Sequence, residues 1–266
     1  MSTKDLETLR PDNPAQVPSE PVLKVRNLKM IFPGDNGGVK ALQGVSFNVF
    51  PQEFVCILGP SGSGKSTLLR LLAGLLKPTA GEVIYTGREQ PTISLVFQDA
   101  NLMPWRTVLQ NITLPLELQG ASPEETRRRG EEWIEQVGLK GFENAWPAEL
   151  SGGMAQRVAI ARSLIQNPDL LLLDEPFGAL DALTREKMGA ELLDLWQSRR
   201  NTVLMVTHSI SEALLLSDRV LVMTPRPGKI SQDLIVDLPR PRTDAMRYTE
   251  HFGALARWLK NAIGNP

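Results

Sequence analysis

The sequence predicts an α/β fold with a mainly parallel sheet, an antiparallel β subdomain near the start and a helical subdomain inserted into the core. Three observations lead to this prediction. Short apolar runs typical of buried strands recur along the chain beside helical patterns. A glycine-rich turn, Gly59 to Gly64, joins one such run to a helical stretch. A helical pattern over about residues 100–165 separates the early runs from the later ones.

The first part of the chain predicts a leader followed by two paired strands. Residues 1–21 are polar and carry four prolines, and they contain no apolar stretch that could serve as a secretory signal core, so we expect a disordered leader. Residues Val22 to Ile31 and Val45 to Phe50 have strand character. The turn Gly34 to Gly38 between them predicts an antiparallel arrangement.

The α/β core begins with a strand, a loop and a helix. Phe54 to Leu58 is the strand, and Lys65 to Leu76 is the helix, which Lys77 and Pro78 end. Ile93 to Phe97 is a further strand. In the helical lobe that follows, Pro123 opens a charged amphipathic helix that runs through Val137.

The later runs return the chain to the sheet. Leu170 to Asp174, Val203 to Thr207 and Arg219 to Met223 have the character of buried parallel strands. A shorter strand is expected near Ile230 to Val236, and a last helix from about Thr243 to Ile263. We therefore expect one domain over residues 22–240 and a C-terminal helical extension over residues 241–266.

Composition excludes several classes of protein. Lys and Arg total 29 against 30 for Asp and Glu, so the near-neutral chain lacks the basic character of a nucleic-acid binder. No apolar run approaches the roughly 20 residues that a membrane-spanning helix needs. Cys56 is the only cysteine, which rules out an internal disulfide and a cysteine metal cage.

The turn after the strand Phe54 to Leu58 has the P-loop pattern GPSGSGKS. Its position after a strand and at the start of a helix is the one its chemistry requires, because converging backbone N–H groups bind phosphates there. Lys65 is expected to reach the β and γ phosphates, and the Ser66 hydroxyl to ligate Mg²⁺. The predicted ATP-binding residues are Gly59, Pro60, Ser61, Gly62, Ser63, Gly64, Lys65, Ser66 and Thr67. The core is therefore that of a P-loop nucleoside triphosphatase.

A second acidic motif, LLLLDEP, narrows the reaction to hydrolysis. Asp174 ends an apolar strand and can hold Mg²⁺ through a water molecule. Glu175 beside it can polarise the water that attacks the γ-phosphate. In a parallel sheet both carboxylates would lie near the P-loop, which argues against two merely solvated acids.

The segment LSGGM, Leu150 to Met154, lies shortly before the acidic strand and opens a helix. With the P-loop and LLLLDEP, this segment resembles the signature loop of the ABC transporter ATPases. The resemblance implies that Ser151, Gly152 and Gly153 touch the γ-phosphate held by a second ATPase subunit, so that hydrolysis needs a two-fold dimer. Met154 stands where the family more often has Gln.

Other residues follow in the order typical of this family, over about residues 22–240. The resemblance implies that Phe32 stacks on adenine and that Gln98 senses Mg²⁺ or the attacking water. It places Asp181 in the loop that meets the other subunit. It also makes His208 a switch that hydrogen-bonds the γ-phosphate and positions Glu175. Taken alone, Phe32 on a strand would more often be a core residue.

Three longer segments resemble nitrate, sulfonate and taurine importer ATPases: Phe97 to Ile112, Asp174 to Glu186 and Asp218 to Ile230. That resemblance implies a peripheral subunit on the cytoplasmic face of the bacterial inner membrane, bound to transmembrane permease subunits and indirectly served by a solute-binding protein. Leu102, Met103, Pro104 and Trp105 are candidates for the permease contact, although they could equally pack inside the helical lobe.

Two alternatives stay open at this stage. A soluble ABC ATPase of DNA repair or translation would use the same ATP chemistry without a membrane partner, but such proteins usually have paired cassettes or long coiled insertions. The second ATPase subunit could be another copy of this chain or a paralogue. The cofactors implied in either case are ATP and Mg²⁺.

Overall fold

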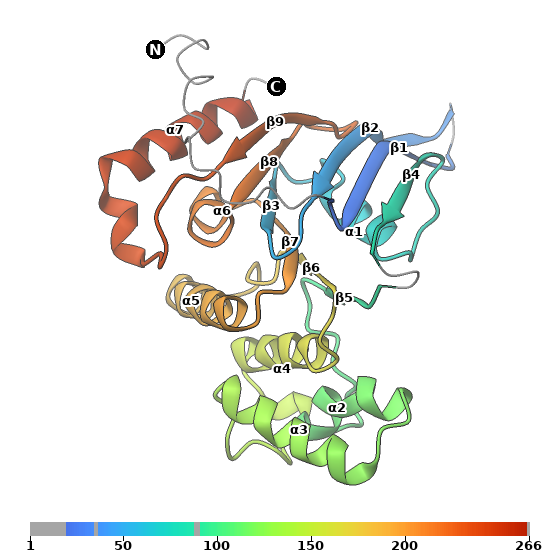
Figure 1. Cartoon of the computed structure of the whole chain (residues 1–266), viewed down its shortest axis with the longest axis vertical. Helices are drawn as coiled ribbons and strands as arrows, with labels where there is room; N and C mark the ends of the chain where they lie inside the picture. Colours follow the sequence, from blue (N-terminus) through green and yellow to red (C-terminus); the bar gives the residue numbers. More distant parts are fainter. Residues whose placement is uncertain (1–19, 35–36, 88–90, 265–266) are drawn as a thin grey trace.

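The structure of the chain is a computed structural model that describes residues 20–34, 37–87 and 91–264. Most of the leader expected over residues 1–21 lies outside the described residues. Figure 1 shows two sheets side by side, helices against the larger sheet and a helical lobe projecting from one end. The fold is α/β, with the predicted parallel sheet, antiparallel sheet and helical insertion.

The bounds of the elements follow the chain. The strands are β1 (Leu23–Phe32), β2 (Val39–Val49), β3 (Phe54–Leu58), β4 (Ala80–Tyr85), β5 (Ile93–Val96), β6 (Leu170–Asp174), β7 (Thr202–Thr207), β8 (Arg219–Met223) and β9 (Ile230–Ile235). The helices are α1 (Lys65–Leu72), α2 (Val108–Leu118), α3 (Pro123–Gln136), α4 (Gly152–Leu164), α5 (Ala182–Arg199), α6 (Ile210–Leu216) and α7 (Glu250–Gly264), with the 3₁₀ helices η2 (Pro147–Glu149) and η3 (Asp244–Tyr248).

The larger sheet has the strand order β5-β6-β7-β3-β8-β9. Its strands run parallel from β5 to β8, and β9 pairs antiparallel with β8. Side chains of β3 alternate between the two faces: Val55 and Ile57 belong to one hydrophobic cluster, and Phe54, Cys56 and Leu58 to the other. Burial on both faces explains the continuous apolar runs of β3, β6 and β7.

The parallel strands bring four functional segments to one edge of the sheet. The P-loop follows β3, Gln98 follows β5, Glu175 follows β6 and His208 follows β7. The register aligns Leu58 with Thr207 and Asp174 with Val206 across neighbouring strands. The carboxyl ends of parallel strands are where open α/β sheets bind ligands, so this edge positions the site.

The smaller sheet has the order β2-β1-β4 and is antiparallel. Its buried side chains and those of α1 form one cluster with the near face of the larger sheet. The strand β4 was not predicted from the sequence. Its residues are half-buried or exposed at the edge of the sheet, so the segment lacks the clear apolar alternation that identifies a strand.

The helical lobe, defined as α2, α3, η2 and α4, lies away from the small sheet in Figure 1. Helix α2 begins with a capping box formed by Thr107 and Gln110, and α3 begins with Ser122 as its N-cap and proline at its first position. Gly130 lets α3 approach α2 closely, because a β carbon there would lie 2.5 Å from Leu109 Cδ1.

Some expected bounds were wrong. The helix expected to run to Leu76 ends at Leu72, where Gly74 takes a φ of 72° and the Leu75 N–H turns back to the Arg70 carbonyl. The strand expected from Val45 begins at Val39, because it pairs along the whole of β1. The last helix, expected from Thr243, is divided into η3 and α7.

The C-terminal segment packs against the sheet through α7 and a buried arginine. Phe252 and Leu259 of α7 enter the main hydrophobic cluster. The Arg242 guanidinium donates to the carbonyls of Leu214, Leu238 and Val236. Burial lowers the pKa of Arg242 to about 10. In the described part of the chain, no helix is long and apolar enough to cross a membrane.

Candidate functional site: a P-loop with two carboxylates and a histidine

The P-loop forms the phosphate-binding end of the site. Gly62 and Gly64 have φ values of 77° and 99°, which glycine adopts without strain. A β carbon at Gly64 would lie 2.9 Å from the Ala41 carbonyl oxygen, and one at Gly59 would lie 2.8 Å from that of Met223. The loop therefore needs glycine both for its conformation and for its close packing on β2 and β8, and its backbone can curve around phosphate groups.

Lys65 is buried at the base of the loop and is 4% exposed. Its Nζ donates to the carbonyls of Gly59 at 2.9 Å and Pro60 at 3.1 Å, and lies 3.4 Å from Glu175 Oε1. These contacts satisfy a buried ammonium group that would otherwise be costly. They also hold its charge beside the P-loop, where a lysine can neutralise the terminal phosphates of a nucleotide.

Ser66 and Asp174 lie together and have oxygen atoms that could bind a cation. The Ser66 hydroxyl donates to Asp174 Oδ1 at 2.9 Å, which joins the start of α1 to the end of β6. Mg²⁺ prefers oxygen ligands and keeps several waters, so one hydroxyl and one carboxylate beside a triphosphate fit it. Burial raises the pKa of the Asp174 carboxyl, and the hydrogen bond from Ser66 offsets part of that rise.

Glu175 lies between the lysine and the histidine. Its φ is 43°, in the left-handed region, and its N–H donates to the Val206 carbonyl of β7 at 3.0 Å. Glu175 Oε2 lies 2.8 Å from Nδ1 of His208, whose ring is half exposed. An uncommon backbone conformation at a charged residue directs this carboxylate out of the strand and toward the P-loop, where it can act on a water molecule.

Gln98 lies beside the turn that follows Glu175. A β carbon at Gly178 would be 3.4 Å from Gln98 Nε2, so the side-chain amide is close to this turn. The sequence predictions Lys65, Ser66, Asp174, Glu175 and Gln98 thus come together at one edge of the sheet.

The signature residues lie at a second place, on the helical lobe. Ser151 is the N-cap of α4 and accepts a hydrogen bond from the Met154 N–H at 3.3 Å. A β carbon at Gly153 would lie 3.0 Å from Thr184 Cγ2, so this end of α4 packs beside α5. Ser151 and Gly152 are exposed here, and the first N–H groups of a helix can bind an anion.

The remaining predicted residues have simple local roles in the subunit. Asp181 caps α5 by accepting from the Thr184 N–H at 3.0 Å, and the hydrogen bonds from Thr184 lower the pKa of its exposed carboxyl. Phe32 ends β1 and packs, partly buried, against the cluster under the small sheet.

One contact of the P-loop was missed from the sequence. Arg226, in the turn between β8 and β9, donates from Nε to the Gly62 carbonyl at 3.3 Å. Gly228 in the same turn packs so tightly that a β carbon there would overlap the Ser63 carbonyl oxygen. The segment Asp218 to Ile230 was noted only for its resemblance to importer ATPases, and nothing in its spacing indicates a contact 164 residues away.

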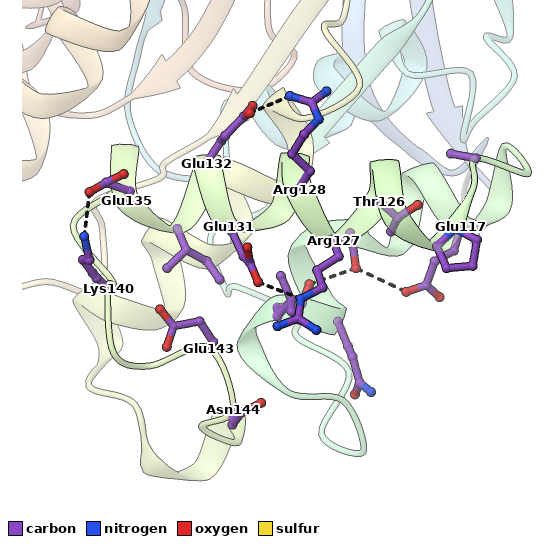
Figure 2. Close-up of a pocket in the computed structure, with 16 residues that line it drawn as sticks. Glu117, Thr126, Arg127, Arg128, Glu131, Glu132, Glu135, Lys140, Glu143 and Asn144 are labelled. Carbon is purple, nitrogen blue, oxygen red and sulfur yellow. Dashed lines mark hydrogen bonds and ion pairs between the residues drawn. The ribbon is translucent and has the colours of Figure 1, made fainter.

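A groove of about 1060 Å³ lies away from this site, on the helical lobe between α2 and α3. Figure 2 shows its charged rim, where Arg127 meets Glu131, Arg128 meets Glu132 and Lys140 meets Glu135. These exposed pairs neutralise one another, so the run of arginines on α3 forms a solvated, ion-paired face.

The fold and this arrangement of residues together define a P-loop ATPase. The ABC transporter family model matches residues 42–178. An uncharacterised ABC transporter ATP-binding protein of Methanocaldococcus jannaschii is 48% identical over 246 residues, covering 91% of this chain and 92% of the relative. The chain belongs to the ABC transporter family and is an ATP-binding subunit that hydrolyses ATP.

Relatives whose names specify a transported solute have a similar sequence identity to this chain. A nitrate import ATP-binding protein of Synechocystis is 47% identical, with 82% of this chain and 83% of the relative covered. A taurine import ATP-binding protein of Pelagibacter ubique is 47% identical, with 78% and 80% covered. A solved dimeric ATP-binding cassette in a post-hydrolysis state, bound to ADP and phosphate, has a TM-score of 0.72 and 37% identity, with 82% of this chain and 100% of that chain covered.

Proposed function

We propose that the chain energises a bacterial importer of a small anion, such as nitrate, an alkanesulfonate or taurine. Two ATPase subunits close on two ATP molecules and move a bound permease, and hydrolysis reopens them. The chain of contacts from Lys65 through Glu175 to His208 carries the ATPase part of this proposal. The names of the nitrate and taurine relatives support the importer part.

Different ATP-binding residues contact different phosphate groups of the nucleotide. Backbone N–H groups of the P-loop bind the β-phosphate, and Lys65 neutralises the β and γ phosphates. Ser66, Asp174 and Gln98 are the residues that would hold Mg²⁺. When bound, Mg²⁺ supplies positive charge that offsets charge developing on the transferred phosphoryl group.

Glu175 is the residue that activates water. Its carboxylate accepts a proton from the attacking water or orients it, while the ion pair with Lys65 and the contact with His208 fix the direction of the two carboxylate oxygens. His208 also hydrogen-bonds the γ-phosphate once the nucleotide is bound. The histidine is therefore a positioning residue for Glu175 as well as a contact of the substrate.

The second subunit completes the site. Ser151, Gly152 and Gly153 at the start of α4 donate to the γ-phosphate held by the other subunit, and Asp181 lies in the loop that meets that subunit. Phe32 stacks on the adenine ring at the end of β1. The dimeric form of the similar cassette, bound to ADP and phosphate, supports this arrangement.

The loop after Gln98 is the permease contact in this proposal. Trp105 is 70% exposed, and large exposed aromatics commonly dominate protein interfaces. The buried Asn111 fixes the loop that carries it, accepting from the Met103 N–H at 2.8 Å and donating to the carbonyls of Arg106 and Thr107. Leu102 is partly buried against the core, so Trp105 and the exposed Pro104 form the free part of this surface.

The same proposal divides the chain into an ATPase domain over residues 22–240, with its helical lobe over about 100–165, and an extension over 241–266. The subunit acts at the cytoplasmic face of the inner membrane as a peripheral protein. A solute-binding protein delivers the anion to the permease and affects this chain only indirectly.

Copurification tests the transport assignment. Tagged Glu175→Gln protein, which we expect to hold ATP in a closed dimer, is isolated with ATP from detergent-solubilised host membranes, and its partners are identified by mass spectrometry. A polytopic permease is the expected partner, and Trp105→Ala in the same background should weaken its recovery. Recovery of only nucleic-acid-processing or ribosomal proteins would overturn the transport assignment and leave the ATPase chemistry standing.

A further inference from the structure

Two side chains of α4 hold the loop that carries Gln98. Gln156 Nε2 donates to the Phe97 carbonyl at 3.3 Å, on the N-terminal side of Gln98. On its C-terminal side, Arg162 donates to the carbonyl of Ala100 at 2.9 Å and that of Asn101 at 3.0 Å. The loop is thus hydrogen-bonded to the helix at both of its ends.

The chemistry of these contacts is unusual for simple helix packing. Gln156 is 3% exposed, and its buried side-chain amide donates a hydrogen bond to this carbonyl. Burial lowers the pKa of Arg162, and its guanidinium forms no ion pair with a carboxylate among the described residues. Partly burying a charge that only backbone carbonyls satisfy has an energetic cost, which an apolar side chain would avoid. Asn101 also has a φ of 46°, so the held loop has a definite and uncommon shape.

The same helix begins at the signature residues. Ser151 caps α4, and the buried face of the helix, which includes Val158 and Ala161, belongs to the main hydrophobic cluster. Successive backbone hydrogen bonds join the residues of one α-helix, so Gln156 and Arg162 lie on the same continuous element that Ser151 caps. A displacement of its first turn is therefore passed to Gln156 and Arg162, and through them to the Gln98 loop.

We propose that Gln156 and Arg162 are positioning residues that make the signature helix and the Gln98 loop move as one body. The approach of Ser151 to the nucleotide of the other subunit and the approach of Gln98 to Mg²⁺ in its own subunit then become a single movement. This inference rests on the proposed roles of Gln98 and the signature loop.

A double-mutant cycle on the steady-state ATPase tests the inference. Arg162→Met removes the guanidinium and keeps an extended side chain, and it is measured alone and with Gln98→Ala. If Arg162 acts through Gln98, the loss of kcat in the double variant is smaller than the product of the two single-variant losses. The expected difference is about five-fold or more. Arg162→Lys keeps a donor for these carbonyls and should recover part of the loss.

The matched control is Arg157→Met on the same helix. Arg157 also donates to a backbone carbonyl, that of Val137, but it pairs with Glu191 and faces away from the Gln98 loop. The loss of kcat in Arg157→Met combined with Gln98→Ala should equal the product of the two single-variant losses. Because Arg162→Met could impair folding, Gln156→Met is taken through the same cycle, and the melting temperature of every variant is recorded.

Different results would overturn the coupling through α4 and the role of Gln98. Losses of kcat that simply multiply when Arg162→Met or Gln156→Met is combined with Gln98→Ala would overturn the inference. They would leave the role of Gln98 intact. An unchanged kcat and an unchanged Mg²⁺ requirement in Gln98→Ala alone would overturn the proposed role of Gln98, and the inference with it.

Discussion

The contact between His208 and Glu175 leads to a quantitative prediction for His208→Ala. The two side chains are 2.8 Å apart, and the glutamate is largely buried while the histidine is half exposed. A hydrogen bond to a charged group contributes about 1.5–3 kcal/mol. Exposure of the histidine reduces this to about 1–2 kcal/mol. If the bond orients the base in the transition state, its loss lowers kcat by about 5–30-fold.

The second histidine of the chain offers a matched control. His251 Nε2 lies 2.8 Å from Asp237 Oδ1, and its side chain is 53% exposed against 51% for His208. This pair also joins an imidazole to a carboxylate at the same distance, but Asp237 is more exposed than Glu175 and the pair lies in the C-terminal segment. His251→Ala should therefore leave kcat unchanged.

The assay is the steady-state ATPase with kcat and KM for ATP determined separately, and with the melting temperature of each variant as a check on folding. The predicted result is a loss confined to His208→Ala and expressed mainly in kcat. Equal kcat values for His208→Ala and the unmodified chain would refute the positioning role of the histidine. Equal losses for the two histidine variants would show that the effect is not specific to the site.

Two further predictions concern the fold of the site. Because burial raises the pKa of Asp174 above its ordinary 3.8, the ionised carboxylate destabilises the folded state, and this cost grows as the pH rises above 3.8 and is fully present above the raised pKa. Asp174→Asn should therefore raise the melting temperature of the nucleotide-free protein at pH 7 but not at pH 3.5. The same variant should lower the Mg²⁺-dependent kcat about 100-fold. A lower melting temperature at pH 7 would contradict this account. Gly64→Ala should lower the melting temperature by about 4–8 °C, since it forces a residue with φ of 99° against the Ala41 carbonyl. Gly120→Ala, with φ of 77° and no atom within 4 Å, should have the smaller effect of the backbone strain alone, and equal shifts for both would refute the close-packing argument.

The sequence predicted best what depends on local patterns. Strands β3, β6 and β8 were predicted with their observed bounds, because residues buried on both faces leave an uninterrupted apolar run. The edge strand β4 was missed because its exposed and half-buried residues leave no apolar run or clear alternation. The end of α1 was misplaced because Leu75 and Leu76 continue the apolar pattern after Gly74 has ended the helix.

For the site, motifs predicted which residues gather but not how they bond. The contact of Lys65 with Glu175 joins the first residue of α1 to the residue after β6, and the observed sheet order brings them within 3.4 Å. Arg162 and Arg226 bind backbone carbonyls, which any residue type supplies, so no pairing of charges in the sequence could indicate their partners.

The central claim is that Glu175 activates the water that hydrolyses ATP, and steady-state hydrolysis by purified Glu175→Gln protein tests it most directly. Glutamine keeps the shape of the side chain but cannot accept the proton. The predicted result is a fall in kcat of about 100-fold or more with ATP binding retained, because general bases contribute roughly 10²–10⁴ to the rate. Hydrolysis by Glu175→Gln at the rate of the unmodified chain would contradict the account.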